Sequence, residues 1–225
     1  MNYGIVVAAG KSTRMGPDVD KAFLGLGSKP LVAYPLQAFE KCHDIDGVIL
    51  VVRKERIESA RGLVQMYGFS KVTKIIAGGN ERQISVQNGV DALPKEAQIV
   101  AVHDGARPCV TPELISETIK SAKKYGSGVA GIKITDTVKS VERGYIVSET
   151  VDRTYLWAVQ TPQTFKVDLL KKALEMVKKK KRVVTDEASA VELLGEDVHI
   201  VPSSSANIKI TTADDLMLAA ALMRL

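Results

Sequence analysis

Short runs of β-branched and other apolar residues alternate along this chain with longer segments whose apolar residues recur at helical spacing. The short runs predict strands, and the longer segments predict helices that each bury one face. Strands are expected at 3–8, 47–52, 72–77, 98–102, 128–133 and 197–201. Helices are expected near 31–42, 54–67, 82–92, 112–125, 167–181, 186–194 and 213–224. This alternation favours an α/β fold with a mostly parallel twisted sheet and helices on both faces.

Three helix boundaries carry their own signals. Thr111 followed by Pro112 is typical of a helix start, and Gly195 is typical of a helix end. Thr212, with two aspartates close behind it, resembles an N-cap followed by acidic residues in the first turn. These residues therefore support the predicted start and end points of three helices.

The alternation breaks between about 134 and 165, where Arg143-Gly144 separates two β-rich stretches. We interpret this segment as a hairpin or arm that projects from the sheet. Such an arm exposes strand edges, and pairing with a second subunit is one way to cover them. Because no internal repeat or low-complexity linker is visible, we expect a single domain over 1–225 that carries the arm.

The composition, with 45% apolar and 25% charged residues, is typical of a soluble globular protein. No run approaches the roughly 18 apolar residues of a membrane span. The N-terminus also lacks the basic and apolar regions of an export signal. Cys42 and Cys109 lie far apart without metal-ligand spacing, as is typical of reduced thiols. We therefore expect a cytoplasmic protein with no membrane segment.

The net charge of +5 raises the alternative of a nucleic-acid-binding protein. Much of the excess lies in Lys178–Arg182, at the C-terminal end of a predicted helix, where cations are favoured. Aromatic residues make up only 5% of the chain, and none interleave with that run as stacking residues would. We expect no nucleic-acid partner, and a basic surface also attracts small anionic substrates.

The segment AAGKSTRMGPDVDK, at 8–21, follows the first predicted strand and combines small residues with the spaced cations Arg14 and Lys21. Small side chains let backbone N–H groups close around phosphate oxygens, and the two cations can balance the charge of a triphosphate. Gly10-Lys11-Ser12 resembles the end of a P-loop. However, five residues separate it from Gly4 where that motif needs four, and those five read as a buried strand. The segment indicates nucleotide binding outside the P-loop class.

Further polar clusters follow other predicted strands, at the ends where open α/β sheets bind ligands. They are Gly78–Arg82, His103–Pro108 and Asn207–Lys209. Each cluster has a plainer explanation by itself. A Gly-Gly pair is common in turns. Asp104 could as well be a helix cap or a turn former as a binding residue, and Lys209 could be a surface lysine. Their joint placement at one edge of one sheet favours a shared binding site.

Taken together, these segments resemble the cytidylyltransferase family that makes 4-diphosphocytidyl-2-C-methyl-D-erythritol in the non-mevalonate isoprenoid pathway. The matching motifs span residues 8 to 211 in family order: AAGKSTRM with Lys21, GGNERQISV, VHDGARP, DTVK, TVDR, QTPQTF, TDEASA and NIKIT. The resemblance implies a Rossmann-like nucleotidyltransferase fold. It implies an enzyme that joins CTP to 2-C-methyl-D-erythritol 4-phosphate and releases pyrophosphate, acting as a homodimer formed through the arm.

The resemblance also implies roles for individual residues. Arg14 and Lys21 would be the catalytic cations at the α-phosphate, in keeping with the need of phosphoryl transfer for alignment and charge neutralisation. The implied nucleotide contacts are Ala8, Ala9, Gly10, Gly79, Asn80, Ser85, Asp104 and Gly105. The implied sugar-phosphate contacts are Arg107, Thr137, Arg153, Thr185 and Lys209. Thr137 and Arg153 would reach this site from the arm of the partner subunit.

Magnesium is expected because a triphosphate needs its charge bridged during the displacement. Asp104 is the carboxylate that we expect nearest to the ion, directly or through water. No cluster in the sequence resembles a protein-only metal cage, so the ion would arrive with CTP. We interpret His103 as structural rather than catalytic, because the attacking group is already a phosphate oxygen and needs no strong general base.

Two alternatives stay open at this level. A sister enzyme that uses ribitol 5-phosphate or another polyol phosphate would share most of these motifs. A non-catalytic nucleotide-binding regulatory module would have lost the loop cations or the acceptor-side Arg and Lys, whereas all four are present. The chain also departs from many relatives at Ser12, Asn80 and Gly105, where Gly, Asp and Ala are common.

Overall fold

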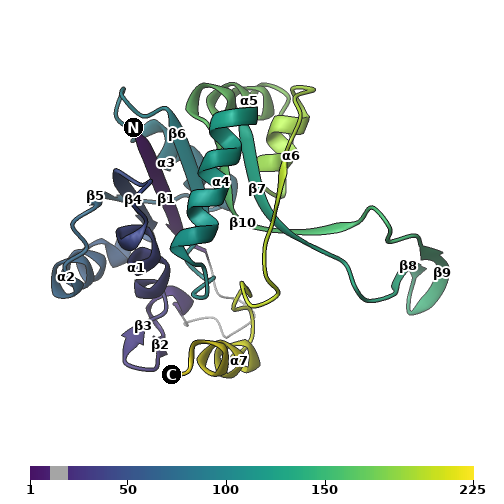
Figure 1. Cartoon of the computed structure of the whole chain (residues 1–225), viewed down its shortest axis with the longest axis horizontal. Helices are drawn as coiled ribbons and strands as arrows, with labels where there is room; N and C mark the ends of the chain where they lie inside the picture. Colours follow the sequence, from purple (N-terminus) through teal and green to yellow (C-terminus); the bar gives the residue numbers. More distant parts are fainter. Residues whose placement is uncertain (11–19) are drawn as a thin grey trace.

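A computed structural model describes residues 1–10 and 20–225 of the chain. Within that part, the central sheet has seven strands in the order β11-β7-β10-β6-β1-β4-β5 (Figure 1). Strands β6, β1, β4 and β5 are parallel neighbours, as are β7 and β11, whereas β10 is antiparallel to both of its neighbours. The strand bounds are β1 Asn2–Ala8, β4 Gly47–Val52, β5 Val72–Ala77, β6 Ile99–Asp104, β7 Ser127–Lys133, β10 Trp157–Lys166 and β11 Ile200–Pro202.

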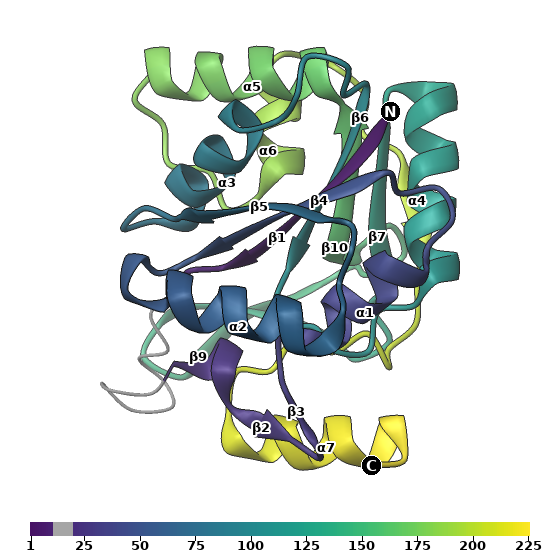
Figure 2. The same cartoon turned by 90° about the vertical axis from the view of Figure 1, so that its left-hand side faces the viewer.

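Helices cover both faces of this sheet, with α1 and α2 on one side and α3, α5 and α6 on the other (Figure 2). Each face of the sheet has its own apolar core. Alternate residues of β1 point to opposite faces, so Val6 packs in the first core, with α1 and α2, and Ile5 packs in the second, with α3, α5 and α6. Helix α4 shares the first core with α1 and α2. The helix bounds are α1 Ala33–Lys41, α2 Ile57–Tyr67, α3 Arg82–Asp91, α4 Pro112–Tyr125, α5 Val167–Lys179, α6 Glu187–Glu192 and α7 Ala213–Met223, with 3-10 turns η2 Lys21–Phe23 and η3 Lys54–Arg56.

The predicted α/β architecture with a mostly parallel sheet is confirmed, and so are the helix starts. The Thr111 side chain accepts a hydrogen bond from the backbone N–H of Leu114 at the start of α4. Thr212 and Asp215 form a reciprocal capping box at the start of α7. Gly195 adopts a left-handed backbone with φ of 79°, just beyond the end of α6. In each case a local preference decides the boundary: a side-chain hydrogen bond at Thr111 and Thr212, and a left-handed backbone at Gly195.

The arm is shorter than the sequence indicates. Strands β8, Val138–Arg143, and β9, Ile146–Val151, form a separate hairpin that projects far from the central sheet (Figure 1). The expected arm over 134–165 is therefore wrong at its end, because β10 returns to the central sheet between β6 and β7.

The sequence of β10 hides its position in the sheet. Its QTPQT run resembles a polar loop, yet Gln160, Thr161, Gln163 and Thr164 are all buried. Their polar groups are hydrogen-bonded inside the protein; the hydroxyl of Thr164, for example, lies 2.8 Å from that of Thr118 on α4. Partners of this kind come from distant segments, so hydrophobic patterning does not reveal the strand.

A small unit beside the sheet joins the region after residue 20 to the C-terminus. Strands β2, Gly25–Leu26, and β3, Lys29–Pro30, form a short hairpin near α7. Leu26 packs with Ile210 and with Ala219 of α7 in a third apolar cluster. This packing brings the segment that begins with Lys21 next to the segment that ends the NIKIT motif. No helix in residues 1–10 and 20–225 is long and apolar enough to cross a membrane.

Candidate active site

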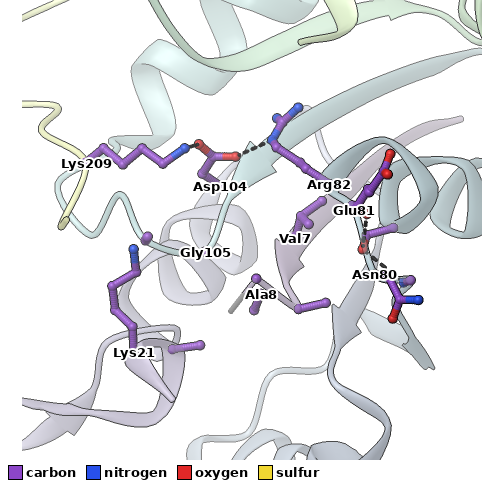
Figure 3. Close-up of a pocket in the computed structure, with 15 residues that line it drawn as sticks. Val7, Ala8, Lys21, Asn80, Glu81, Arg82, Asp104, Gly105 and Lys209 are labelled. Carbon is purple, nitrogen blue, oxygen red and sulfur yellow. Dashed lines mark hydrogen bonds and ion pairs between the residues drawn. The ribbon is translucent and has the colours of Figure 1, made fainter. Parts of the chain in front are cut away.

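The carboxyl ends of β1 and β6 and the loop after β5 surround a cavity (Figure 3). The cavity is lined by every residue that was assigned to the nucleotide: Ala8, Ala9, Gly10, Gly79, Asn80, Ser85, Asp104 and Gly105. Lys21 and Lys209 line it as well. The structure thus places the separate motifs around one space, which we call the nucleotide cavity.

The Gly78-Gly79 pair is more than a turn, because it lets the loop after β5 lie directly against β1. A Cβ on Gly78 would collide with the side chain of Ala9, and one on Gly79 would collide with Ile84. The Gly79 N–H donates to the Ser85 hydroxyl at 3.1 Å, and that hydroxyl donates to the carbonyl of Glu81 at the same distance. The chain therefore closes around the cavity with backbone, as close approach to a phosphate or a base requires.

Asp104 ends β6 and is the most strongly paired charge in the cavity, with only 10% of its side chain exposed. Its Oδ2 lies 2.7 Å from Lys209 Nζ and 4.0 Å from Arg107 Nε, and its Oδ1 accepts from Arg82 Nε at 3.0 Å. Burial by itself would raise the pKa of Asp104, but the charges of Arg82, Lys209 and Arg107 outweigh it. The net pKa lies well below its ordinary range, so the carboxylate is ionised at neutral pH.

His103 holds the backbone behind Asp104. Its Nε2 lies 3.2 Å from the carbonyl oxygen of Arg107, an acceptor, so Nε2 carries the proton. Its Nδ1 then accepts from the Thr161 hydroxyl at 3.0 Å, and that oxygen accepts from the Asp104 N–H at 3.1 Å. Burial lowers the pKa of His103 to about 4. A neutral imidazole with both nitrogens occupied fits the structural role that the sequence favours.

A second cavity adjoins the first, and three of the residues assigned to the sugar phosphate line it: Arg107, Thr185 and Lys209. We call it the acceptor cavity. Arg107 Nη1 donates to the carbonyl of Asn207 at 2.7 Å, which places this guanidinium beside the NIKIT segment. Among the described residues, its buried Nε has no hydrogen-bond partner. The Arg107 guanidinium therefore brings positive charge to the wall of the acceptor cavity.

Two of the assigned residues, Thr137 and Arg153, line neither cavity of their own chain. Thr137 and Arg153 are exposed at the base of the arm, where Arg153 Nη1 donates to the Thr137 hydroxyl at 3.4 Å. They therefore lie next to each other, but not in the site of their own chain. Arg14 lies outside the described residues. Lys21 does reach the nucleotide cavity, where its Nζ donates to the carbonyl of Ile210 at 2.7 Å and its side chain points toward Gly105 (Figure 3).

The donor set around Asp104 fits a magnesium ion that is held mainly by substrate phosphates. Within residues 1–10 and 20–225, no group of three or more His, Cys, Asp or Glu side chains is placed to hold a metal. Asp104 provides one carboxylate at the cavity wall, and its oxygens have acceptor capacity beyond Arg82 and Lys209. One or two carboxylates together with phosphate oxygens are a common magnesium environment.

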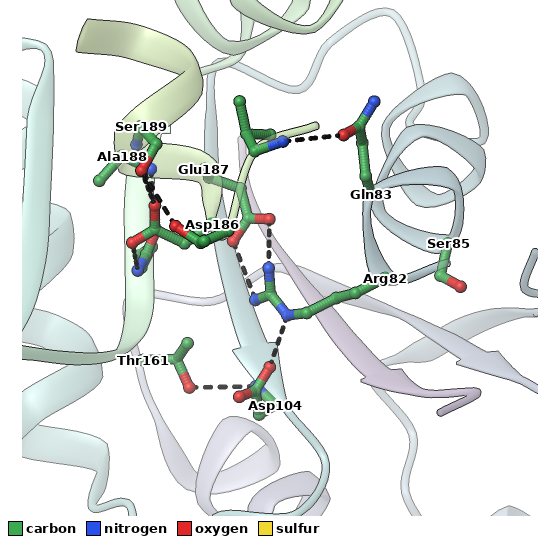
Figure 4. Close-up of polar contacts among 12 residues, drawn as sticks. Arg82, Gln83, Ser85, Asp104, Thr161, Asp186, Glu187, Ala188 and Ser189 are labelled. Atoms are coloured by element: carbon green, nitrogen blue, oxygen red, sulfur yellow. Dashed lines mark hydrogen bonds and ion pairs between the residues drawn. The ribbon is translucent and has the colours of Figure 1, made fainter. Parts of the chain in front are cut away.

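Sequence reasoning gave no role to Arg82 or Glu187, although both lie in motifs that it singled out. The Arg82 guanidinium forms two hydrogen bonds with the Glu187 carboxylate, at 2.6 and 3.0 Å, while its Nε contacts Asp104 (Figure 4). The available signal was a charged residue in each of two motifs, but other polar residues beside them gave no reason to pair these two. Their pairing across 105 positions becomes visible only in the folded chain.

Comparison with known proteins gives one consistent result. The family model for 2-C-methyl-D-erythritol 4-phosphate cytidylyltransferase matches residues 3–225. A protein of that name from Alkaliphilus oremlandii (strain OhILAs) is 41% identical over 98% of this chain and 94% of its own length. A protein of the same name from Geobacillus thermodenitrificans (strain NG80-2) is 41% identical over 99% of this chain and 97% of its own length. The crystal structure of 4-diphosphocytidyl-2C-methyl-D-erythritol synthase from Anaerococcus prevotii DSM 20548 superposes with a TM-score of 0.86, at 28% identity, covering 100% of this chain and 99% of that one.

The buried His103 predicts a specific acid sensitivity of folding. Its pKa is about 4 in the folded protein and near 6.5 in the unfolded chain, so the unfolded chain takes up the proton first as the pH falls. Stability is therefore lost as the pH falls from about 6.5 toward 4. Between pH 7 and pH 5 this single group should remove about 2 kcal/mol from the free energy of unfolding.

Urea unfolding of the wild type and of His103→Gln at pH 7 and pH 5 measures this effect. The variant should lose about 2 kcal/mol less than the wild type between the two pH values, because glutamine takes up no proton. The other acid-titrating groups are common to both proteins. Equal losses in the two proteins would show that His103 is already protonated, or free to become so, in the folded state.

Proposed function

This chain belongs to the 2-C-methyl-D-erythritol 4-phosphate cytidylyltransferase family, and we propose how its residues carry out the family's reaction. The protein is a nucleotidyltransferase that condenses CTP with 2-C-methyl-D-erythritol 4-phosphate to give 4-diphosphocytidyl-2-C-methyl-D-erythritol and pyrophosphate. The proposal rests on one observation: the nucleotide cavity and the acceptor cavity share a wall. Asp104 and Lys209 line both the nucleotide cavity and the acceptor cavity, so substrates in the two spaces meet beside these side chains.

In this proposal CTP lies in the nucleotide cavity, with its base and ribose against the Gly79–Asn80 loop and Ser85. Backbone groups of Ala8, which ends β1, and of Ala9 and Gly10, which follow it, face the triphosphate. Backbone carbonyls and amides can distinguish cytosine from uracil by its N4 donor and N3 acceptor. The tight packing of the two glycines, described above, supports a recognition surface made of main chain rather than of long side chains.

The acceptor phosphate binds in the acceptor cavity, where Lys209 and Arg107 supply positive charge and Thr185 a hydroxyl. One of its oxygens attacks the α-phosphorus of CTP, and the bond from that phosphorus to the bridging oxygen breaks as pyrophosphate leaves. Lys21 and Arg14 stabilise the negative charge that develops on the transferred phosphoryl group. Since the nucleophile is already an anion, the chain supplies alignment and cations and no general base.

We propose that magnesium binds with CTP and that Asp104 faces it, directly or through water. The ion would neutralise negative charge on the triphosphate and on the leaving pyrophosphate. Asp104 is suited to this position because its low pKa keeps it ionised. Its two cationic neighbours also hold it at the wall that both cavities share.

We also propose that the enzyme is a homodimer in which the arm of each subunit completes the other's acceptor cavity. Thr137 and Arg153 support this, since they lie together at the base of the arm and outside the cavities of their own chain. The hairpin exposes apolar side chains, including Tyr145 and Ile146, that a second subunit could cover. We further propose that residues 1–225 act as one domain and that the protein works in the cytoplasm.

The acceptor is tested by measuring pyrophosphate release from CTP and magnesium with two substrates in turn. We expect a value of kcat/KM for 2-C-methyl-D-erythritol 4-phosphate at least roughly 10²-fold above that for ribitol 5-phosphate, because misplacement of the nucleophile by about 1 Å is enough for such a loss. A higher value with ribitol 5-phosphate would assign the chain to the sister activity. CTP binding without turnover of either acceptor would indicate a regulatory module.

Lys21→Ala should lower kcat by roughly 10² or more, because one preorganised cation at the developing charge is removed. The melting temperature should change far less, since Lys21 lies at a cavity wall and forms no part of the apolar cores. The matched control is Lys95→Ala, a lysine exposed at the opposite end of β6. Wild-type turnover of Lys21→Ala would remove this residue from the mechanism.

Mixed dimers test whether Arg153 acts across the subunit interface. Arg153→Ala and Lys21→Ala should each be nearly inactive alone. After the two are unfolded together and refolded as a 1:1 mixture, half of the dimers should be mixed, and each mixed dimer should contain one intact site. Activity should then reach roughly a quarter of the wild-type value. A mixture no more active than its parents would place Arg153 in its own subunit's site.

A further inference from the structure

The wall between the two cavities consists of three residues, Arg82, Asp104 and Lys209, which line both spaces. Asp104 and Lys209 have roles in the function proposed above, whereas Arg82 has none. Arg82 begins α3 and has 27% of its side chain exposed, so it is largely enclosed between the two cavities. A cation in this position, directly beside the phosphates of both substrates, needs a physical explanation.

The guanidinium of Arg82 is fully committed to two carboxylates. Nη1 and Nη2 donate to the two oxygens of Glu187, at 2.6 and 3.0 Å, and Nε donates to Asp104 Oδ1 at 3.0 Å (Figure 4). Because the guanidinium is planar and rigid, this arrangement fixes the two carboxylates relative to each other. Lysine carries the same charge but has no such planar geometry. The contact with Oδ1 also leaves Oδ2 of Asp104 for Lys209, at 2.7 Å.

Glu187 is itself held firmly. It is only 3% exposed and begins α6, a helix anchored to β10 through Gln163. The amide of Gln163 donates to Asp186 Oδ2 at 2.9 Å and accepts from the N–H of Ala188 at 3.0 Å, so both neighbours of Glu187 are fixed. The Asp186 side chain also accepts from the N–H of Ser189 and caps the helix. Glu187 therefore provides a rigid support for the arginine.

The charge of Arg82 explains why the residue that supports it, Glu187, is acidic. Glu187 neutralises Arg82, which would otherwise be a free cation beside two phosphate sites and would bind a substrate phosphate itself. With Glu187 present, Asp104 and Lys209 keep their places at the wall. A buried ion pair of this kind is weak evidence for a role in stability, because removing both partners together is often neutral. Its position at the wall is better explained by the geometry of the reaction.

We propose that Arg82 is a positioning residue for nucleotidyl transfer: held by Glu187, it fixes the Asp104 carboxylate so that Lys209 points the acceptor phosphate at CTP. This inference rests on the function proposed above. Substitution of Arg82 should therefore change kcat and the KM for the acceptor. The affinity for CTP without magnesium should change little, because the Gly79–Asn80 loop and the backbone after β1 do not depend on the Arg82 side chain.

The decisive variant is the double substitution Arg82→Met with Glu187→Leu. Arg82→Met alone leaves two buried carboxylates without their arginine and should lower stability, whereas the double variant removes both charges and leaves Asp104 with Lys209. Its melting temperature should return to within a few degrees of the wild type. Its kcat should stay roughly 10²-fold low, and its Kd for CTP, measured without magnesium, should stay within about threefold. Arg82→Lys should show the same kcat deficit, since charge alone does not restore the planar contacts.

The control is Arg61→Met, which breaks an exposed ion pair with Glu58 on α2 and should leave kcat and the Kd for CTP unchanged. A double variant that regains wild-type kcat along with its stability would overturn the inference and show a purely structural pair. A Kd for CTP that rises as much as kcat falls would also overturn it, since Arg82 would then bind the nucleotide itself. Both results leave the proposed function intact. Absence of turnover by the wild type would overturn the function and the inference together.

Discussion

The arrangement of the candidate site depends on one buried charge, the carboxylate of Asp104 at the end of β6. Removing a carboxylate from water costs on the order of several kcal/mol unless cations and hydrogen-bond donors replace the solvent. Here Arg82, Arg107 and Lys209 replace it, and they come from the start of α3, from the loop after β6 and from the segment before α7. Pairing this one charge therefore draws two distant segments, and the loop that follows Asp104 itself, to the same edge of the sheet.

A layer of buried polar groups behind Asp104 keeps that edge in place. His103, Thr161 and Arg107 share a chain of hydrogen bonds that ends at the Asp104 N–H, and Gln163 binds the first turn of α6. Each of these hydrogen bonds pairs a donor with an acceptor, which is the condition under which a buried polar network rigidifies a structure. The antiparallel strand β10 carries much of this network. It therefore serves the site as well as the sheet.

The arm makes a different contribution, because it packs as a hairpin of its own and carries two assigned residues away from the cavities of its chain. Within one subunit the acceptor cavity has Arg107, Thr185 and Lys209, and a phosphate with a polyol attached can accept more donors than these provide. A site completed by a second subunit would link assembly to activity. The length and exposure of the hairpin are readily understood on that basis.

Much of this protein follows from the sequence by itself. Parallel strands such as 47–52 are buried on both faces and form unbroken apolar runs, and caps such as Thr111 and Thr212 use only local hydrogen bonds. The motifs at strand ends likewise predicted the nucleotide cavity, since parallel strands all end at one edge. The position of β10 and the pairing of Arg82 with Glu187 were decided by tertiary structure. Buried polar groups are stable only with partners supplied by distant segments, and no local pattern identifies those partners.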